Sequence, residues 1–433
     1  MSLKFGTDGV RAEALTVLTT QYVSALANAA AQVLGGGQWL IGRDTRESGP
    51  VLESAVAAGL AAAGARPVSV GVLPTPALAW LSAQRGVPAA MITASHNPWQ
   101  DNGVKFFAPG GLKLSDSVER AIESLLDPDG SAPHAVVPSH SDSLTDYVDH
   151  LVALGGSLSG LRLVLDCANG AMSVAAPAAF RALGADVMVI HDSPNGRNIN
   201  AHCGATHVQS LAAAVVAEGA SMGLAFDGDG DRVIAIDELG NAVDGDRLIA
   251  LAAIQLRDEG RLHAGTVVVT VMSNLGFHKA MAAAGIEVMT TAVGDRYVLE
   301  ALDAHGHSIG GEQSGHIIYR HLATTGDGLL AGMRLAQFVH DGGHSLAALA
   351  GAVMTSYPQV LLNVQVRERH PNAADELVAE IQLAEAALGG DGRILVRASG
   401  TEPLIRVMVE AATEAIAQSV AEDLVVAVVT RFG

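Results

Sequence analysis

Two short segments of this chain carry side chains that could do chemistry. Residues 93–98 read Thr-Ala-Ser-His-Asn-Pro and place the hydroxyl of Ser95 on a loop just after an apolar run. Residues 227–232 read Asp-Gly-Asp-Gly-Asp-Arg and place three carboxylates at alternate positions after a second apolar run. A phosphoryl group in transfer needs a hydroxyl that carries it and a hard cation that neutralises its oxygens. Together the two segments indicate phosphoryl transfer.

The carboxylates of Asp227, Asp229 and Asp231 are suited to a divalent cation. Carboxylate oxygens prefer Mg²⁺ or Ca²⁺ to softer metals, and the intervening glycines let the backbone curl so that the three side chains converge. An EF-hand would use the same alternate positions, but Arg232 stands where that loop needs glycine, and no amphipathic helices flank the segment. A solvated acidic turn is the plainer alternative, as a turn-capping serine is for Ser95.

Other enzyme classes fit less well. Ser95 and His96 are adjacent in the chain, and the segment around Ser95 lacks the Gly-x-Ser-x-Gly pattern, so a Ser–His hydrolase is disfavoured. Neither a Walker-type phosphate loop nor a Gly-x-Gly-x-x-Gly sequence occurs, so the sequence lacks the common motifs of nucleotide-binding proteins.

Two further loops combine groups that recognise sugars and phosphates. Residues 310–316 read Gly-Gly-Glu-Gln-Ser-Gly-His, which is typical of hydroxyl recognition, and His316 could also move a proton. Residues 397–403 read Arg-Ala-Ser-Gly-Thr-Glu-Pro, the composition of a phosphate clamp. An ordinary β-turn is the alternative for this last loop. Lys105 follows Ser95 closely enough to reach the same pocket, although a surface lysine is the commoner case.

Composition sets limits on the class of protein. The 433 residues exceed what one hydrophobic core usually supports, so several domains are expected. The net charge of −19 argues against nucleic acid and anionic membranes as partners, but permits a small anionic substrate. No segment resembles a signal peptide or a membrane span, so a cytoplasmic location is expected. Cys167 and Cys203 show no disulfide or metal-site spacing, which predicts two reduced thiols.

Short apolar runs alternate with longer helical patterns, which predicts βαβ units. The expected strands are 39–42, 67–72, 89–93, 161–166, 186–190, 224–226, 233–236 and 267–271. The expected helices are 21–34, 52–63, 76–85, 174–183, 209–217 and 246–256. An α+β tail is expected from strands at 360–366, 393–398 and 405–409 and helices at 372–388 and 414–430.

The loops at 93–98, 227–232, 311–316 and 397–403 resemble, in this order, the four active-site loops of the α-D-phosphohexomutase superfamily. The resemblance covers essentially the entire chain and is supported by residues 5–11, 166–171, 198–204, 293–297 and 324–328. It implies an α/β fold, with three α/β sandwich domains with mixed sheets and a smaller C-terminal α+β domain around a central cleft. These domains are expected at 1–150, 151–250, 251–358 and 359–433.

The resemblance also implies a role for each loop. Ser95 would be the phosphoserine and would hold one Mg²⁺ together with the three aspartates. Arg11, Lys105 and His316 would lie close to the transferred phosphoryl group or the reacting hydroxyl. The implied substrate-binding residues are Glu312 and Ser314 for sugar hydroxyls, Arg397, Ser399, Gly400 and Thr401 for the non-reacting phosphate, and Arg232 and Arg406 as further cations.

The activity implied by the resemblance is interconversion of glucosamine 6-phosphate and glucosamine 1-phosphate, with glucosamine 1,6-bisphosphate as intermediate, in the supply of cell-wall precursors. A phosphomannomutase or phosphoglucomutase is the alternative on the same fold, while a metal-dependent phosphatase and a Ca²⁺-binding module represent other classes. A small phosphosugar is the expected partner, with no nucleic acid or membrane, for a monomer or homodimer. The sequence departs from the superfamily pattern at Ala12, at Ala398 and in the shortened segment 12–21.

Overall fold

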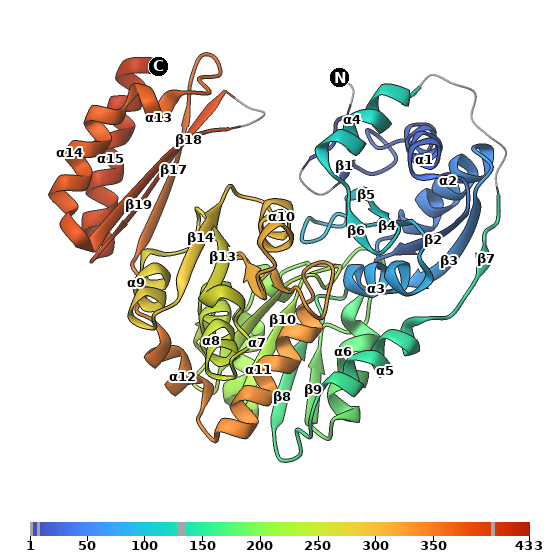
Figure 1. Ribbon diagram of the computed structural model, residues 1–433, viewed down its shortest axis with the longest axis horizontal. Coiled ribbons are helices and arrows are strands. Elements are labelled where there is room, and N and C mark those ends of the chain that lie inside the picture. The colour runs from blue at the N-terminus through green and yellow to red at the C-terminus, as the bar shows by residue number, and fades with distance from the viewer. Residues whose placement is uncertain (1–2, 7–8, 128–135, 400–402) are drawn as a thin grey trace. The chain divides into compact units, whose positions relative to one another are not determined.

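The computed structural model describes residues 3–6, 9–127, 136–399 and 403–433. Contacts divide the chain into two compact units, one formed by Met1–Met272 and Gly285–Val353 and the other by Ser273–Ala284 and Met354–Gly433. Over the described residues, the first unit contains sheets of seven, five and four strands, and the second unit contains a sheet of three (Figure 1). None of the described helices is long and apolar enough to cross a membrane.

The first sheet has the strand order β1-β5-β4-β2-β3-β7, with β6 paired to β5. Strands β3, β2 and β4 run parallel, and β5 returns antiparallel beside β4. Parallel strands are covered on both faces, which explains why β4 is buried along its whole length. The strands are β1 (Val10–Glu13), β2 (Gln38–Arg43), β3 (Arg66–Val72), β4 (Ala89–Ile92), β5 (Asp101–Ala108), β6 (Leu112–Lys113) and β7 (Ser139–His140). The accompanying helices are α1 (Thr20–Leu34), α2 (Gly49–Ala62), α3 (Thr75–Arg85), α4 (Asp116–Leu125) and α5 (Leu144–Leu154).

The second sheet has the order β12-β11-β10-β8-β9. Strands β9, β8 and β10 run parallel, so their carboxyl ends meet at one edge of the sheet. Strand β11 returns antiparallel beside β10, which makes residues 227–232 the connection between two strands and excludes the EF-hand interpretation. The elements are β8 (Arg162–Asp166), α6 (Met172–Ala182), β9 (Asp186–Ile190), η1 (Gly204–Thr206), α7 (Gln209–Glu218), β10 (Met222–Phe226), β11 (Val233–Asp237) and β12 (Ala242–Val243).

The third sheet has the order β14-β13-β15-β16, and its last two strands form an antiparallel hairpin. Helices α8 and α11 begin at aspartates that cap them, since Asp244 accepts a hydrogen bond from the N–H of Arg247 and Asp327 accepts one from the N–H of Leu330. The elements are α8 (Gly245–Asp258), η2 (His263–Gly265), β13 (Thr266–Thr270), β14 (Glu287–Thr291), α10 (Asp295–His305), β15 (Ile309–Gly311), β16 (Ile317–Tyr319), α11 (Gly328–Gly342) and α12 (Leu346–Val353).

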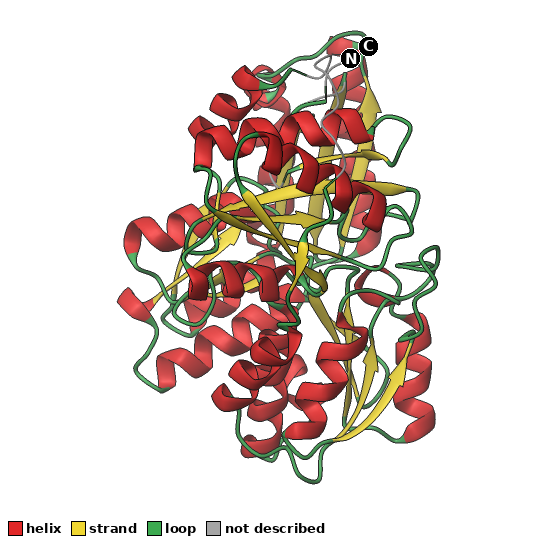
Figure 2. Cartoon of the chain, turned by 90° about the vertical axis from the view of Figure 1, so that its right-hand side faces the viewer, coloured by secondary structure: helices red, strands yellow, loops and turns green. Residues whose placement is uncertain are grey.

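The second unit is a three-stranded antiparallel sheet, ordered β17-β19-β18, with helices against it. The predicted helix over 372–388 is instead two helices that meet at Leu377, and the break lets that fully buried side chain enter the core. Figure 2 shows the sheets and the helices of both units in a second view, and this architecture confirms the predicted fold class of three α/β domains and a smaller α+β domain. The elements are α9 (Leu275–Ala283), β17 (Gln359–Gln365), α13 (Ala373–Glu376), α14 (Val378–Leu388), η3 (Gly389–Asp391), β18 (Gly392–Ala398), β19 (Leu404–Ala411) and α15 (Glu414–Phe432).

Helices α1 and α2 approach each other closely at a glycine. A Cβ atom on Gly59 would lie 2.0 Å from the carbonyl oxygen of Ser24, a distance that no side chain can occupy. The absence of a side chain at Gly59 therefore allows α1 and α2 to pack closely beside the first sheet.

Replacing Gly59 by alanine should lower the free energy of unfolding by about 2–3 kcal/mol, because the new methyl group overlaps the α1 backbone. Gly351→Ala is the matched control, since a Cβ atom at this exposed position of α12 meets nothing within 4 Å. Alanine favours helix there, so stability should stay unchanged or rise by up to about 1 kcal/mol. Urea unfolding measures both variants, and equal effects at the two positions would contradict the close α1–α2 contact.

Candidate active site

The three aspartates of residues 227–232 converge as the sequence predicts. Asp227, Asp229 and Asp231 are buried, and each offers a carboxylate oxygen that lies within 4.8 Å of the others. Among the described residues, one oxygen of Asp229 and one of Asp231 are buried without a hydrogen-bond partner. Three carboxylate oxygens form the donor set that a hard cation such as Mg²⁺ prefers, and the two unpartnered oxygens fit such an ion.

Ser95 lies against this carboxylate cluster. Its Oγ donates a hydrogen bond of 2.6 Å to Asp227 Oδ2, whereas the His96 Nδ1 atom lies 3.4 Å away. Gly228 permits the approach, because a Cβ atom there would lie 2.6 Å from the carbonyl oxygen of Ser95. Burial and the nearby guanidinium groups of Arg232 and Arg11 lower the pKa of His96 to about 4, so its ring is neutral at pH 7. The short hydrogen bond thus joins the nucleophile candidate to the cation site, and its contact with the histidine is the longer one.

Lys105 reaches the cluster from β5. Its Nζ donates hydrogen bonds of 2.8 Å to Asp229 Oδ2 and 3.2 Å to Asp231 Oδ2. Thr75, the first residue of α3, adds a hydrogen bond of 2.6 Å from its Oγ1 to Asp229 Oδ2 and one from its N–H to the Asp229 carbonyl oxygen. Strand β5 of the first sheet and helix α3 beside it therefore fix the orientation of Asp229.

The charges within the cluster are unevenly compensated. Burial and the neighbouring carboxylates of Asp231 and Asp229 raise the pKa of Asp227 to about 8. Burial also opposes a charge on Asp231, but Lys105 and His316 outweigh burial and hold the pKa of Asp231 well below its usual range. The charge of Arg232 therefore does not outweigh burial and like-charge repulsion at Asp227, the carboxylate that faces the Ser95 hydroxyl.

The loop that carries Ser95 is held by a buried arginine. All five N–H groups of the Arg46 guanidinium are used: one binds the Asp44 carboxylate and four bind main-chain carbonyl oxygens. The carbonyl acceptors are those of Ser95, Asn97, Pro98 and Asp101. Ser95 has a φ of 53°, a left-handed conformation that is costly for a serine, so these bonds hold its hydroxyl in place against backbone strain.

Two neighbours complete this support. Asp44 Oδ2 accepts a hydrogen bond from Thr93 Oγ1, which in turn accepts one from the N–H of Ser95. Asn200 approaches from the second sheet and donates to the carbonyl oxygens of Ser95 and Asn97. The sequence motif 93–98 already contained Thr93. The sequence assigned no role to Asp44, Arg46 and Asn200, which support this loop, or to Thr75, which binds Asp229, since only a contact in space shows these roles.

A cavity of about 420 Å³ opens beside the cluster. Of the predicted site residues, Arg11, Asp231, Arg232, Glu312 and His316 line this cavity. Glu312 is oriented by the N–H of Gly294, which donates to its carboxylate over 3.1 Å. The cavity thus has cationic groups, carboxylates and imidazoles on its walls, a set of groups that can bind a phosphorylated sugar.

His316 is buried between two carboxylates. Its Nδ1 lies 3.6 Å from Asp231 Oδ1, and its Nε2 lies 3.3 Å from Asp295 Oδ2. Burial opposes a charge on the ring, yet Asp295 and Asp231 outweigh burial and raise the pKa of His316. The N–H of Gly326 donates to Nε2, a bond that only an unprotonated Nε2 accepts. Protonation of this ring is therefore coupled to the position of Gly326.

Ser314 does not line this cavity. It is exposed in the turn between β15 and β16, near Glu312 in the chain. The structure therefore brings Glu312 and His316 of this loop to the cavity wall but leaves the Ser314 side chain outside it.

The predicted phosphate clamp lies in the second unit. Arg397 on β18 and Arg406 on β19 are directly opposite each other, so two like charges share one face of the sheet. Burial and the charge of Arg406 lower the pKa of Arg397. Ser399 is buried, and its N–H donates to the carbonyl oxygen of Leu404. Gly400 and Thr401 lie outside the described residues.

Comparison with known proteins gives a consistent result. Models of the family described as phosphoglucomutase/phosphomannomutase match alpha/beta/alpha domain I at residues 2–131, domain II at 145–240, domain III at 244–357 and the C-terminal domain at 361–427. The chain therefore belongs to the phosphoglucomutase/phosphomannomutase family, within the α-D-phosphohexomutase superfamily, and it is an enzyme of the isomerase class.

Two relatives in sequence and two solved structures are similar to this chain over almost its whole length. The phosphoglucosamine mutase of Rhodococcus jostii is 50% identical over 442 residues, which cover 98% of each chain. That of Frankia casuarinae is 50% identical over 446 residues, again with 98% of each chain covered. A phosphoglucomutase/phosphomannomutase family protein from Burkholderia thailandensis, solved by crystallography, has a TM-score of 0.81 at 25% identity and covers 98% of this chain and 96% of its own. Aspergillus fumigatus N-acetylphosphoglucosamine mutase, solved with GlcNAc-6P and magnesium, has a TM-score of 0.71 at 20% identity and covers 99% and 96% of the two chains.

Replacing Arg46 by lysine should lower the free energy of unfolding by about 2–5 kcal/mol. Lysine keeps the charge beside Asp44 but has only three donors, so at least two of the five buried hydrogen bonds made by Arg46 are lost. Arg43→Lys is the matched control on β2, because the ion pair of Arg43 with Glu53 is partly exposed and should cost under about 1 kcal/mol. Urea unfolding measures both, and a loss at Arg46 no larger than that at Arg43 would refute the supporting role of Arg46.

Proposed function

We propose that this enzyme interconverts glucosamine 6-phosphate and glucosamine 1-phosphate by phosphoryl transfer at Ser95. The observation that carries the proposal is the hydrogen bond of 2.6 Å between Ser95 Oγ and Asp227 Oδ2, which joins a strained, buried hydroxyl to a cluster of three carboxylates. The choice of sugar rests on the 50% identity to relatives named phosphoglucosamine mutase. A cytoplasmic location and a monomeric or homodimeric chain remain part of the proposal.

The proposed reaction moves one phosphoryl group at a time. The bond between the phosphoryl group and Ser95 Oγ breaks as the free sugar hydroxyl bonds to phosphorus, and the proton of that hydroxyl ends on Ser95 Oγ. Lys105 and His316 are placed near the cluster to relay this proton and to balance charge. The glucosamine 1,6-bisphosphate formed then turns around, and its other phosphoryl group returns to Ser95.

The residues of this chain divide the remaining tasks. Asp227, Asp229 and Asp231 would hold Mg²⁺ together with the phosphorylated Ser95, and the ion, when bound, neutralises the phosphoryl oxygens. Arg11 and Arg232 on the cavity wall attract the anionic substrate. Glu312 binds sugar hydroxyls, and we assign the same task to Ser314.

The clamp for the non-reacting phosphate would consist of Arg397, Ser399, Gly400, Thr401 and Arg406. Two guanidinium groups placed opposite each other on one face of a sheet repel each other, and a dianion between them removes that cost. The same clamp has to accept either phosphate of the bisphosphate, so it should recognise phosphate and not the sugar.

Ser95→Ala should reduce mutase turnover by at least about 10³-fold, because the phosphoryl carrier is lost while the fold is kept. A coupled assay with glucosamine 6-phosphate, mannose 6-phosphate and glucose 6-phosphate measures turnover, and Ser117→Ala serves as control at an exposed serine. Wild-type turnover in Ser95→Ala would refute the mechanism. In the wild-type enzyme, a preference for mannose or glucose 6-phosphate would favour the alternative mutases, and release of inorganic phosphate would identify a phosphatase.

Arg397→Ala should weaken binding of glucosamine 6-phosphate and glucosamine 1-phosphate alike, by about 1.5–3 kcal/mol for a lost charged hydrogen bond. Arg397→Lys should restore only part of this, because an ammonium group cannot reproduce the two-pronged guanidinium contact. Arg367→Ala removes the same charge from an exposed position of the second unit and should leave both affinities unchanged. Calorimetric Kd values for the two isomers decide the matter, and a loss confined to one isomer would contradict a shared clamp.

A further inference from the structure

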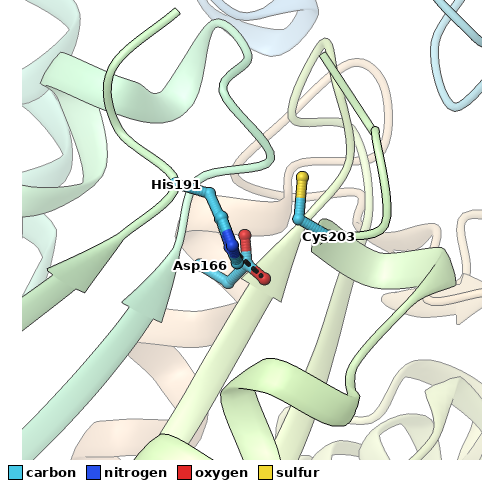
Figure 3. Close-up of side chains that lie close together, drawn as sticks. All are labelled: Asp166, His191 and Cys203. Carbon is cyan, nitrogen blue, oxygen red and sulfur yellow. Dashed lines mark ion pairs between the residues drawn. The ribbon is translucent and has the colours of Figure 1, made fainter. Parts of the chain in front are cut away.

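Three side chains with different metal-binding atoms meet at the carboxyl edge of the second sheet (Figure 3). Asp166 is the last residue of β8, and His191 directly follows β9, the neighbouring parallel strand, in which Ile190 pairs with Asp166. Cys203 arrives on the loop before η1. One carboxylate oxygen, one imidazole nitrogen and the thiol sulfur all lie within 4.8 Å of one another.

The contact between His191 and Asp166 has the length of a hydrogen bond but not its direction. His191 Nδ1 lies 3.1 Å from Asp166 Oδ2, yet among the described residues this buried nitrogen has no aligned hydrogen-bond partner. Two ligands that are each about 2.0–2.1 Å from a tetrahedral zinc ion lie roughly 3.3 Å apart, so the spacing also suits two ligands of a common ion.

The backbone holds the imidazole in this position. His191 has a φ of 51°, an uncommon conformation for a residue with a side chain, and its carbonyl oxygen accepts a hydrogen bond of 2.6 Å from the N–H of Asn169. The left-handed backbone at the end of β9 thus directs the His191 ring toward Asp166, although this conformation is unfavourable for a residue with a side chain.

The three groups retain free electron pairs. Asp166 accepts one N–H at each oxygen, from Ala168 and from Gly204, and a carboxylate oxygen has a second lone pair beyond such a bond. Cys203 Sγ has a weak contact of 3.9 Å with the amide nitrogen of Asn169. A bound divalent cation takes the place of the thiol proton, because the cation stabilises the thiolate.

We propose that Asp166, His191 and Cys203 form a second cation site, which binds Zn²⁺ and is separate from the carboxylate cluster at Asp227. A set of one oxygen, one nitrogen and one sulfur donor suits a borderline ion such as zinc, whereas three carboxylates suit magnesium. Three protein ligands leave a fourth position for water, and the half-buried His191 provides the route from solvent. The sequence predicted that neither cysteine belongs to a metal site. The proposal revises this prediction for Cys203 and keeps it for Cys167.

The site has a direct connection to the Ser95 loop. The N–H of Asn200 donates to the carbonyl oxygen of Ala168, two residues after Asp166, and the Asn200 side chain donates to the carbonyl oxygen of Ser95. An ion that fixes the Asp166 loop therefore stabilises the support of Ser95 as well. Zinc should for this reason raise the thermal unfolding temperature of the chain.

The test uses the tag-free full chain, stripped of metal and kept in excess Mg²⁺. Titration with Co²⁺ should produce one equivalent of a thiolate-to-cobalt charge-transfer band, and Zn²⁺ should abolish that band by displacement. Only a cysteine ligand gives this signal, so cobalt bound to surface histidines does not interfere. Absence of the band at one equivalent of Co²⁺ would overturn the proposal.

Variants identify the ligands independently of catalysis. Cys203→Ser should abolish the band and weaken Zn²⁺ binding at least about tenfold, while Cys167→Ser, at the other buried cysteine, should preserve both. Asp229→Asn should also preserve both, because it alters only the carboxylate cluster. Loss of the band in Cys167→Ser, or an unchanged Zn²⁺ affinity in Cys203→Ser, would refute the site.

A second variant covers the case in which Cys203→Ser does not fold. His191→Asn keeps the left-handed backbone, since asparagine tolerates that conformation better than most residues, and His191 is partly exposed. It should weaken Zn²⁺ binding at least about tenfold without changing the unfolding temperature of the metal-free chain. An unchanged Zn²⁺ affinity in this variant would overturn the proposal.

Discussion

The burial of three carboxylates in one turn is the constraint on which the structure of the first unit depends. Like charges within 4.8 Å of one another, withdrawn from water, are unstable unless cations or protons compensate them. The compensation comes from elements that are distant in sequence: Lys105 reaches in from β5, and His316 faces Asp231 from the β15–β16 hairpin. The cavity of about 420 Å³ is lined by Asp231 of the cluster and by His316 of this hairpin. His316 therefore belongs both to the compensation of the carboxylates and to the wall of the cavity.

The loop of Ser95 depends on a different interaction. Its backbone turns through a left-handed serine and exposes carbonyl oxygens to the protein interior, where unpaired acceptors are costly. Arg46 satisfies four of these carbonyl oxygens, and Asp44 balances the charge of Arg46. A buried ion pair adds little stability by itself, but removing one partner is expensive, so the pair fixes one conformation of the loop. That rigidity sets the distance between the hydroxyl of Ser95 and Asp227.

The carboxylate cluster at Asp227 and the proposed cation site at Asp166 both lie at the carboxyl edge of the second sheet. Strand β10 ends at the carboxylate cluster, while β8 and β9 end at Asp166 and His191, because the carboxyl ends of parallel strands meet on the same side. The cluster at Asp227 offers three carboxylates, whereas the proposed site offers one oxygen, one nitrogen and one sulfur atom. Each site would therefore select its cation by the type of donor atom, although the two sites lie at the same edge. Asn200 lies between the two places and contacts the Ser95 loop, which links the Asp166 loop to the nucleophile candidate.

The sequence by itself determined the local features. The strand at 186–190 and the alternate aspartates of residues 227–232 were found because periodicity and side-chain chemistry are properties of neighbouring residues. What only the tertiary structure decided is which distant groups meet. Thr75 binds Asp229 across 154 positions and Arg46 binds the Ser95 carbonyl oxygen across 49, and no local pattern encodes such pairs. Strand β5, with its glycine and lysine, was missed as a strand for the same reason, since its burial comes from pairing with β4 and β1. Local propensity acts over a few residues, whereas compensation of a buried charge depends on distance in space, and the fold alone sets that distance.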